Sequence, residues 1–236
     1  DDIRMRGDDH NALVALNGAL ADKRYSYNFT KENQPAQPIE IIHKLSENHI
    51  ATQDLIFQAG EGCDIMIIEH YISDKGAFQN NQLSVIVENS AQLAHHVLQL
   101  SDDQAFHYNH VIASVHENAT YRSFTLNKGA KLSRREVISH SNGEEAEISV
   151  SGVNLVDGDR LSDITLETLH NVAHGRSRQH FKTVLKESAT GVFQGKIFVE
   201  RDAQKTDGYQ MNNALLLSDK AQMNSKPQLE IYADDV

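Results

Sequence analysis

The sequence predicts an all-β protein built as a parallel β-helix, preceded by one short helix. Three observations predict this fold. Strand-like runs recur from residue 39 onward, many of them are separated by short polar corners that close on alanine, and most corners lack the two-residue turns typical of β-hairpins. Together these features indicate coils that stack on one another, as in a solenoid.

One amphipathic helix is predicted near the start of the chain. Asp9 is a candidate N-cap, and residues 11–21 place Leu13, Leu16 and Leu20 at the spacing of a single helical face. The three leucines would form the apolar face of this helix.

The helix belongs to a predicted flank, residues 1–23, and the β-helix core is predicted over residues 24–236. Within the core, apolar and polar residues alternate in runs of strand length, as at Leu83, Val85 and Val87. The runs expected to form strands are 24–29, 39–45, 64–72, 83–88, 95–100, 121–126, 147–151, 164–169, 192–200 and 229–233.

The corners between runs share a small residue. Polar pairs or triplets close on alanine at positions 91, 105, 119, 130, 146, 189, 203 and 221, and steps of 14 residues recur among them. Asn142-Gly143 and Asp157-Gly158 are exceptions that could start hairpins. Stacked parallel coils therefore fit the pattern better than the alternative fold, a β-sandwich.

Composition narrows the function classes. Asp plus Glu is 33 against 22 for Lys plus Arg, and the net charge of −11 would repel nucleic acid. Apolar runs are too short to span a bilayer, and the start of the chain has no signal-peptide pattern. Cys63 is the only cysteine, so no internal disulfide can form. We expect a soluble, cytoplasmic protein that binds neither nucleic acid nor membrane.

Histidine is the most interesting candidate for a site. Ten of the 13 histidines lie between His70 and His180. No HExxH or CxxC spacing is present, so no metal ligand is predicted. Two interpretations stay open: exposed or locally hydrogen-bonded histidines, or a functional cluster. No nucleophile motif is present either, and no catalytic residue is predicted.

The last segment, "KPQLEIYADDV", has the alternation of a half-buried strand. Ile231 is expected to face the core, and a strand in last position would expose unpaired backbone groups to another chain. The residues predicted to form a partner interface are Lys226, Gln228, Leu229, Glu230, Tyr232, Asp234 and Asp235.

Four segments of the last third resemble a known family. They are "GRSRQHFKTVL" (175–185), "GVFQGKIFV" (191–199), "DAQKTDGYQMNNALLLSD" (202–219) and "KPQLEIYADDV" (226–236). Together they are similar to the SufB/SufD family of the SUF iron–sulfur cluster assembly system, and to its SufD branch in particular.

The resemblance implies a right-handed parallel β-helix and a non-enzymatic subunit. It implies a complex with a SufB-like paralogue and a SufC-like ATPase, a homodimer when the subunit is alone, and final strands that pair across the interface. A nascent iron–sulfur cluster would belong to the complex, with no cofactor assigned to this chain. The family continues past residue 236 into a Lys-Cys-Ser-His-Gly stretch and a C-terminal helical domain, which this sequence lacks.

Two alternatives remain at this point. One is a SufB-like cluster scaffold. The other, suggested by the fold alone, is a β-helix polysaccharide lyase or hydrolase that would use the carboxylates Asp157, Asp159 and Asp163.

Overall fold

The structure is a computed structural model that describes residues 11–21 and 24–236; the predicted N-cap Asp9 lies outside them. These residues form one helix, α1 (Ala12–Leu20), and 15 strands. The strands are β1 (Arg24–Phe29), β2 (Ile39–Leu45), β3 (Ile50–Ala59), β4 (Asp64–Ser73), β5 (Phe78–Val87), β6 (Gln92–Gln99), β7 (Phe106–Val115), β8 (Thr120–Asn127), β9 (Leu132–Ser141), β10 (Glu147–Val156), β11 (Leu161–His170), β12 (Arg176–Leu185), β13 (Thr190–Val199), β14 (Asp207–Leu216) and β15 (Gln222–Ile231).

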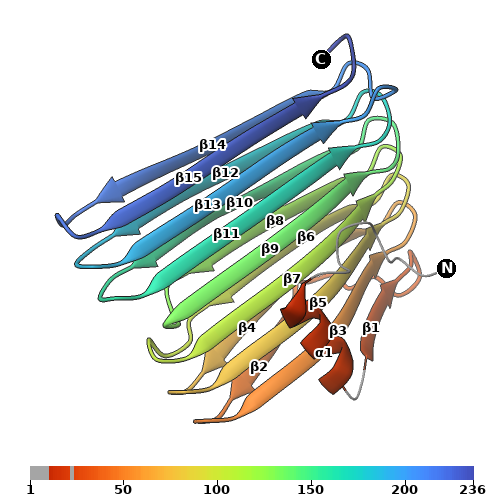
Figure 1. The fold of residues 1–236 in the computed structure, drawn as a ribbon. Helices are drawn as coiled ribbons and strands as arrows, with labels where there is room; N and C mark the ends of the chain where they lie inside the picture. The colour runs from red at the N-terminus through yellow and green to blue at the C-terminus, as the bar shows by residue number, and fades with distance from the viewer. Residues whose placement is uncertain (1–10, 22–23) are drawn as a thin grey trace.

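The strands alternate between two sheets that lie face to face (Figure 1). The odd sheet has eight strands in the order β1-β3-β5-β7-β9-β11-β13-β15, and the even sheet has seven, from β14 to β2. Neighbouring strands in both sheets are parallel, as in the pairs β5–β7 and β10–β12. The structure therefore confirms the predicted parallel β-helix and rules out the β-sandwich.

One coil of this β-helix contains two strands and two corners. In the odd sheet Ile50 pairs with Phe78 and Phe78 with Phe106, so the chain returns to the same place after 28 residues. The 14-residue alanine step in the sequence is therefore half a coil, because each coil turns twice.

The corners combine a left-handed residue with a small buried one. Ser90 has a φ of 59° and precedes Ala91, and Gly62 has a φ of 65° and precedes Cys63. All eight predicted corner alanines are buried, which confirms their structural role. Cys63 is also buried and takes the place of such an alanine, so its position is explained by packing.

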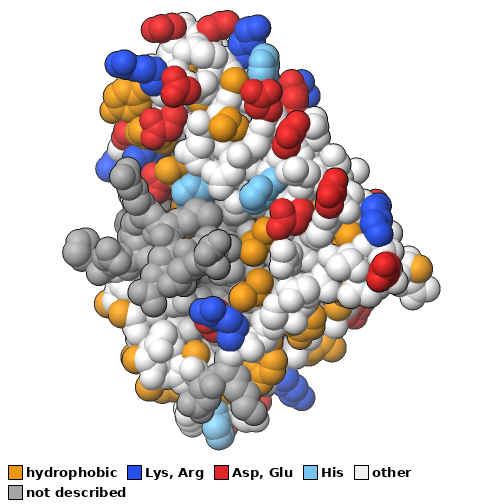
Figure 2. Space-filling model, turned by 90° about the vertical axis from the view of Figure 1, so that its right-hand side faces the viewer, with side chains coloured by type: hydrophobic (Ala, Val, Ile, Leu, Met, Phe, Trp, Pro, Cys, Tyr) orange, Lys and Arg blue, Asp and Glu red, His pale blue; other side chains and the backbone are white. Residues whose placement is uncertain are grey.

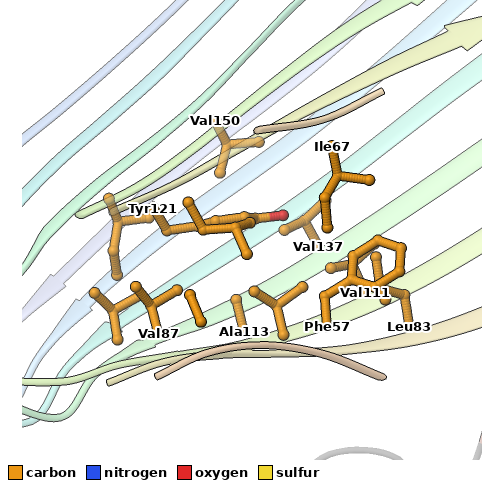
Figure 3. Close-up of a cluster of buried hydrophobic side chains, with 14 of the residues drawn as sticks. Phe57, Ile67, Leu83, Val87, Val111, Ala113, Tyr121, Val137 and Val150 are labelled. Atoms are coloured by element: carbon orange, nitrogen blue, oxygen red, sulfur yellow. The ribbon is translucent and has the colours of Figure 1, made fainter. Parts of the chain in front are cut away.

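The core lies between the two sheets, where alternate side chains of each strand point inward. Apolar side chains from both sheets interdigitate there (Figure 3). Labelled examples are Phe57, Leu83, Val111 and Val137 from the odd sheet and Ile67, Tyr121 and Val150 from the even sheet. Among the described residues, no helix has the length and hydropathy needed to cross a membrane.

Helix α1 is present, as predicted, but its leucines do not form a buried face. Asn17 is its only buried residue, whereas Leu16 and Leu20 are 39% and 51% exposed. The helix packs on the outer surface of the odd sheet through amides: Asn17 Nδ2 donates to the Asn80 carbonyl at 2.7 Å, and Gln82 Nε2 donates to the Val14 carbonyl at 2.7 Å. Because the sheet surface beneath the helix is polar, the helix packs on it with its polar face.

Several strands were not predicted, namely β3, β7, β9, β12 and β14. Strand β7 shows the reason, because its buried positions include His107, Asn109 and His110 and therefore give no apolar alternation. The last strand was also placed too late: it runs from Gln222 to Ile231 and ends before Tyr232.

Candidate functional site

The last coil, β14 and β15, is the candidate interface. Each of these strands pairs on one side only, β14 with β12 and β15 with β13, and each ends the strand order of its sheet. Most of their residues are exposed. Large apolar side chains exposed there and in the adjoining corners are Tyr209, Leu215, Leu216, Leu217, Leu229, Ile231 and Tyr232.

The hydrogen-bond pattern of β15 shows which backbone groups reach its free edge. Gln222 N–H donates to the Ala189 carbonyl at 3.0 Å, and Tyr232 N–H donates to the Val199 carbonyl at 2.9 Å. Because the N–H groups of alternate residues point to the same side of a parallel strand, the N–H groups of Ser225 and Leu229 point to the free edge. Pro227 has the same parity and no N–H, as edge strands tolerate.

The predicted interface residues fall on three different surfaces of this coil. Leu229 pairs in register with the buried Ile197, so its side chain points toward the interior side and is 57% exposed because no coil covers it. Lys226, Gln228 and Glu230 alternate with it and project from the outer surface of the odd sheet. Tyr232, Asp234 and Asp235 follow the strand.

Tyr232 belongs to the chain's own packing. Its N–H bonds to Val199, and its ring lies 5.3 Å from that of Phe198. Asp235 likewise contacts the corner between β13 and β14, one coil earlier, because its N–H donates to Gln204 Oε1 at 2.9 Å. The backbone N–H of Tyr232 is therefore already bonded within the chain.

A second feature is a buried charge network inside the β-helix, which the sequence did not predict. Glu69 on β4 is fully buried and accepts hydrogen bonds from His43 Nε2 at 2.8 Å, His95 Nε2 at 2.6 Å and the Tyr71 hydroxyl at 2.8 Å. The two histidines come from β2 and β6, on either side of β4. Stacking of coils thus joins residues 26 positions apart.

The network continues across the interior to the odd sheet. Asn109 Nδ2 donates to the Tyr71 hydroxyl at 3.4 Å, and Arg135 Nη1 donates to Asn109 Oδ1 at 2.5 Å. Arg135 also donates to Ser123 Oγ at 3.3 Å, and it is almost completely buried. A buried carboxylate and a buried guanidinium are therefore linked through neutral polar groups.

These contacts fix the charge states. Burial alone would raise the pKa of Glu69, but hydrogen bonds from His43 and His95 outweigh it and hold that pKa well below its ordinary value. Burial, with Arg135 nearby, lowers the pKa of His107 to about 3, so this imidazole is neutral at pH 7. Within the part of the chain that the structure describes, no three His, Cys, Asp or Glu side chains are placed to hold a metal ion.

The histidines divide between the two interpretations. Six are buried: His43, His95, His107, His110, His140 and His170. These six are not exposed, but hydrogen bonds to side chains of the same chain, as at His43, His95 and His170, agree with the first interpretation. A clue in the sequence was available for His95, which stands in the alternating series of Leu93 and Val97 on β6.

A further polar cluster lies on the outer surface of the odd sheet. Glu136 accepts from the Tyr108 hydroxyl at 2.5 Å and from Asn11 Nδ2 at 2.7 Å, and it contacts His110 Nδ1 at 3.2 Å. Burial raises the pKa of Glu136, but hydrogen bonds from His110 and Tyr108 and the nearby Arg134 lower it to about 2. Since Asn11 also caps α1, this cluster anchors the helix.

The carboxylates of the hydrolase alternative do not form a catalytic pair. Asp157 and Asp159 line a surface groove of about 510 Å³, but each is ion-paired, with Arg160 and Lys131 respectively. Lys131 lowers the pKa of Asp159, whereas a general acid needs a raised one. Burial raises the pKa of Asp163, but this residue does not line the groove, and its carboxylate lies 3.7 Å from Arg134 on the odd sheet.

Comparison with known proteins places the chain in a family. Residues 42–236 match the family model described as SUF system FeS cluster assembly, SufBD core domain. The iron–sulfur cluster assembly protein SufD of Escherichia coli is 30% identical over 231 residues, 95% of this chain and 55% of that protein. Protein ABCI7, chloroplastic, of Arabidopsis thaliana is 29% identical over 180 residues, 75% of this chain and 38% of its own length.

A SufBD family protein of Synechocystis is 32% identical over 159 residues, 67% of this chain and 35% of that protein. The chain thus spans about half or less of the length of the curated relatives it matches. Since the family model covers most of the stacked coils, the chain belongs to the SufBD family of the SUF iron–sulfur cluster assembly system.

Proposed function

We propose that this chain is the core of a SufD-type subunit, a non-catalytic scaffold in a cytoplasmic iron–sulfur cluster assembly complex. It pairs with a SufB-like paralogue through the last coil and works with a SufC-like ATPase. In isolation it forms a homodimer through the same surface. The nascent iron–sulfur cluster is the cargo of the complex.

The observation that supports this proposal most strongly is the state of the last coil. Strands β14 and β15 each present a free edge, and the exposed side chains beside these edges include Leu216 and Leu229. Backbone groups on such an edge form hydrogen bonds with an added strand, while apolar side chains supply burial. A second β-helix end offers the same two features and could extend both sheets.

The ion pairs and hydrogen bonds of four carboxylates, two exposed and two buried, support a non-catalytic role. Asp157 and Asp159 are paired with cations, and Glu69 and Glu136 accept hydrogen bonds from histidines on the same chain. These groups stabilise the fold in the arrangement observed. A scaffold needs stable coils and a specific edge, and the described residues supply both.

The experiment is co-expression of the full-length protein with its SufB-like and SufC-like partners, followed by purification on a tag carried by the SufB-like subunit. We expect the three proteins to co-purify and cluster formation to need all three. Failure of the protein to co-purify, together with unchanged cluster formation in its absence, would reject the proposal.

A pair of variants tests whether the free edge of β15 is used. Leu229→Ala removes the side chain, and Leu229→Pro also removes the edge-facing N–H. We expect Leu229→Pro to weaken the complex about tenfold more than Leu229→Ala, because a desolvated carbonyl on the partner loses its donor. Equal effects of the two variants would show that no strand pairs at this edge.

A further inference from the structure

The interior of the β-helix has an apolar part and a polar part, and strand β5 shows the division. Toward the end of this strand the inward side chains are apolar, as at Leu83 and Val87 (Figure 3). Toward its start the inward positions hold Gln79 and Asn81. Figure 2 looks onto the corners where the odd-numbered strands end, whose surface carries charged side chains. The polar start of β5 lies away from these corners.

Sheet register joins the polar inward positions into two rows that run along the axis of the β-helix. The odd row contains Gln79, His107, Ser133 and Ser162, and the even row contains Gln99, Asn127 and Asn154. Neighbours in a row lie on successive coils, about 4.8 Å apart. The two rows face each other across the interior, because Asn127 Nδ2 donates to Ser162 Oγ at 2.9 Å.

Several polar atoms of these rows have no hydrogen-bond partner among the residues that the structure describes. They are Gln79 Oε1, Gln99 Nε2, His107 Nδ1, Asn127 Oδ1 and Asn154 Oδ1, and both polar side-chain atoms of Asn81, beside the odd row, share this state. Each of these residues is at most 3% exposed. Buried polar atoms of folded proteins are almost always hydrogen-bonded, so these atoms point to a bound partner.

The mixture of donors and acceptors identifies the kind of partner. Gln79 Nε2 donates to the His43 carbonyl at 3.3 Å, and Gly129 N–H donates to Gln99 Oε1 at 3.0 Å. These main-chain contacts fix both amide orientations, so Gln79 offers an acceptor and Gln99 offers a donor. A metal cation binds only acceptors and a simple anion only donors, whereas a water molecule donates and accepts.

Apolar side chains close the rows toward the last coil. The odd row continues from Ser162 to Gly191 and Met223, and Met223 packs against Val156 and Leu185. The polar rows are therefore separated from the surface proposed to bind a partner. Molecules held between the rows would exchange slowly with solvent, because the polar atoms that bind them are inaccessible from outside.

We propose that ordered water molecules occupy the interior between the two rows, bonded to Gln79, Asn81, Gln99, His107, Asn127 and Asn154. Waters on successive coils are too far apart to bond directly, so side chains connect them. The rows adjoin the buried charge network, because the His107 ring lies 4.6 Å from that of Tyr71, whose hydroxyl donates to Glu69. The waters thus extend the hydrogen-bonded surroundings of that network.

A high-resolution crystal structure of the full-length protein tests the proposal directly. We expect water density within ~3.2 Å of Gln79 Oε1, Gln99 Nε2 and both polar side-chain atoms of Asn81. An interior without such density, in which the amides turn to bond one another, would overturn the proposal.

The Asn81→Val variant gives a test whose sign is decisive. If Asn81 had no partner, replacing its amide with an apolar side chain would remove a buried unbonded group and raise the midpoint of thermal unfolding. If Asn81 binds water, the same change removes those hydrogen bonds, and we expect the midpoint to fall by about 4 °C or more.

Asn224→Val is the matched control, because it makes the same change at an exposed strand position. We expect its midpoint to stay within about 2 °C of the parent. A midpoint of Asn81→Val that rises, or that shifts no more than that of Asn224→Val, would overturn the proposal. The crystal structure of the parent protein gives the answer if Asn81→Val does not fold.

Discussion

The last two coils of the β-helix differ in burial although their strands follow the same geometry. Ile197 on β13 and Leu229 on β15 are neighbours in register, yet Ile197 is 1% exposed and Leu229 is 57% exposed. The only difference is that a further coil covers the first and none covers the second. In a solenoid, stability therefore depends on nearest neighbours, and the last coil gains most from a partner.

The largest effect is expected where an interior charge loses its partners. Glu69→Ala removes the acceptor for His43, His95 and Tyr71 and leaves Arg135 without a counter-charge, so we expect a loss of ~3–5 kcal/mol in the free energy of unfolding. Chemical denaturation measures it. Glu230→Ala is the matched variant on the last coil, where the exposed pair with Lys196 contributes below ~1 kcal/mol. If Glu69→Ala and Glu230→Ala reduced the free energy of unfolding by similar amounts, the charged groups around Glu69 would be accessible to water in solution.

The pair Ile197→Ala and Leu229→Ala tests the comparison directly. Truncating Ile197 leaves a cavity between covered coils and should cost ~2–5 kcal/mol. Truncating Leu229 removes a side chain that is mostly in water and should cost below ~1 kcal/mol in the monomeric chain, measured at concentrations too low for the proposed homodimer. Thermal and chemical unfolding measure both. Equal losses would mean that the last coil is already covered in solution.

Lowering the pH should reduce the free energy of unfolding over a range that the pKa of His107 sets. His107 stays neutral in the folded chain down to a pH of about 3, whereas in the unfolded chain it takes up a proton below its ordinary pKa of 6.5. Its contribution to stability is therefore complete above pH 6.5 and is lost as the pH falls toward 3. The His107→Asn variant should reduce the slope of unfolding free energy against pH by up to ~1.4 kcal/mol per unit in this window.

The pKa shift of Glu69 also makes the free energy of unfolding fall with decreasing pH, but at lower pH than that of His107. Its pKa is lowered on folding, so its contribution to stability is present above the ordinary glutamate pKa of 4.5 and is lost as the pH falls below that value. Leu229→Ala removes no titratable group and should keep the parent slope. If His107→Asn also keeps it, His107 is not held neutral by burial.

The smallest effect is expected at Cys63. It occupies a corner position that alanine fills elsewhere, after a residue with positive φ, and it is 1% exposed. Cys63→Ala should change the unfolding free energy by less than ~1 kcal/mol, because alanine fits the same corner. Loss of cluster assembly in this variant at unchanged stability would assign the cysteine a chemical role instead.

The sequence was informative where interior side chains are apolar and corners are small. The alternation at Leu83, Val85 and Val87 and the alanine corners predicted the β-helix correctly, because both patterns arise from contacts within one coil. Strands β7 and β9 were missed because their inward positions hold His107, Asn109 and Arg135. Those residues are compatible with burial only through partners from other coils, which spacing along the chain does not show.

The same limit applies to the sites. The uncapped final strand was predicted, but the direction of the Tyr232 N–H depends on the register with β13, which no local pattern specifies. The leucine spacing predicted an amphipathic helix, but which face of α1 packs depends on the polarity of the sheet surface beneath it, which no local pattern shows.

Hydrogen–deuterium exchange of β15 tests the central claim most directly. In the full-length protein diluted until sedimentation velocity shows a monomer, the amides of Ser225 and Leu229 should exchange quickly, while those of Gln222 and Tyr232, bonded to Ala189 and Val199, should be protected. On adding the SufB-like subunit, the amides of Ser225 and Leu229 should become protected as well. Complex formation that leaves these two amides exchanging as fast as before would contradict the account.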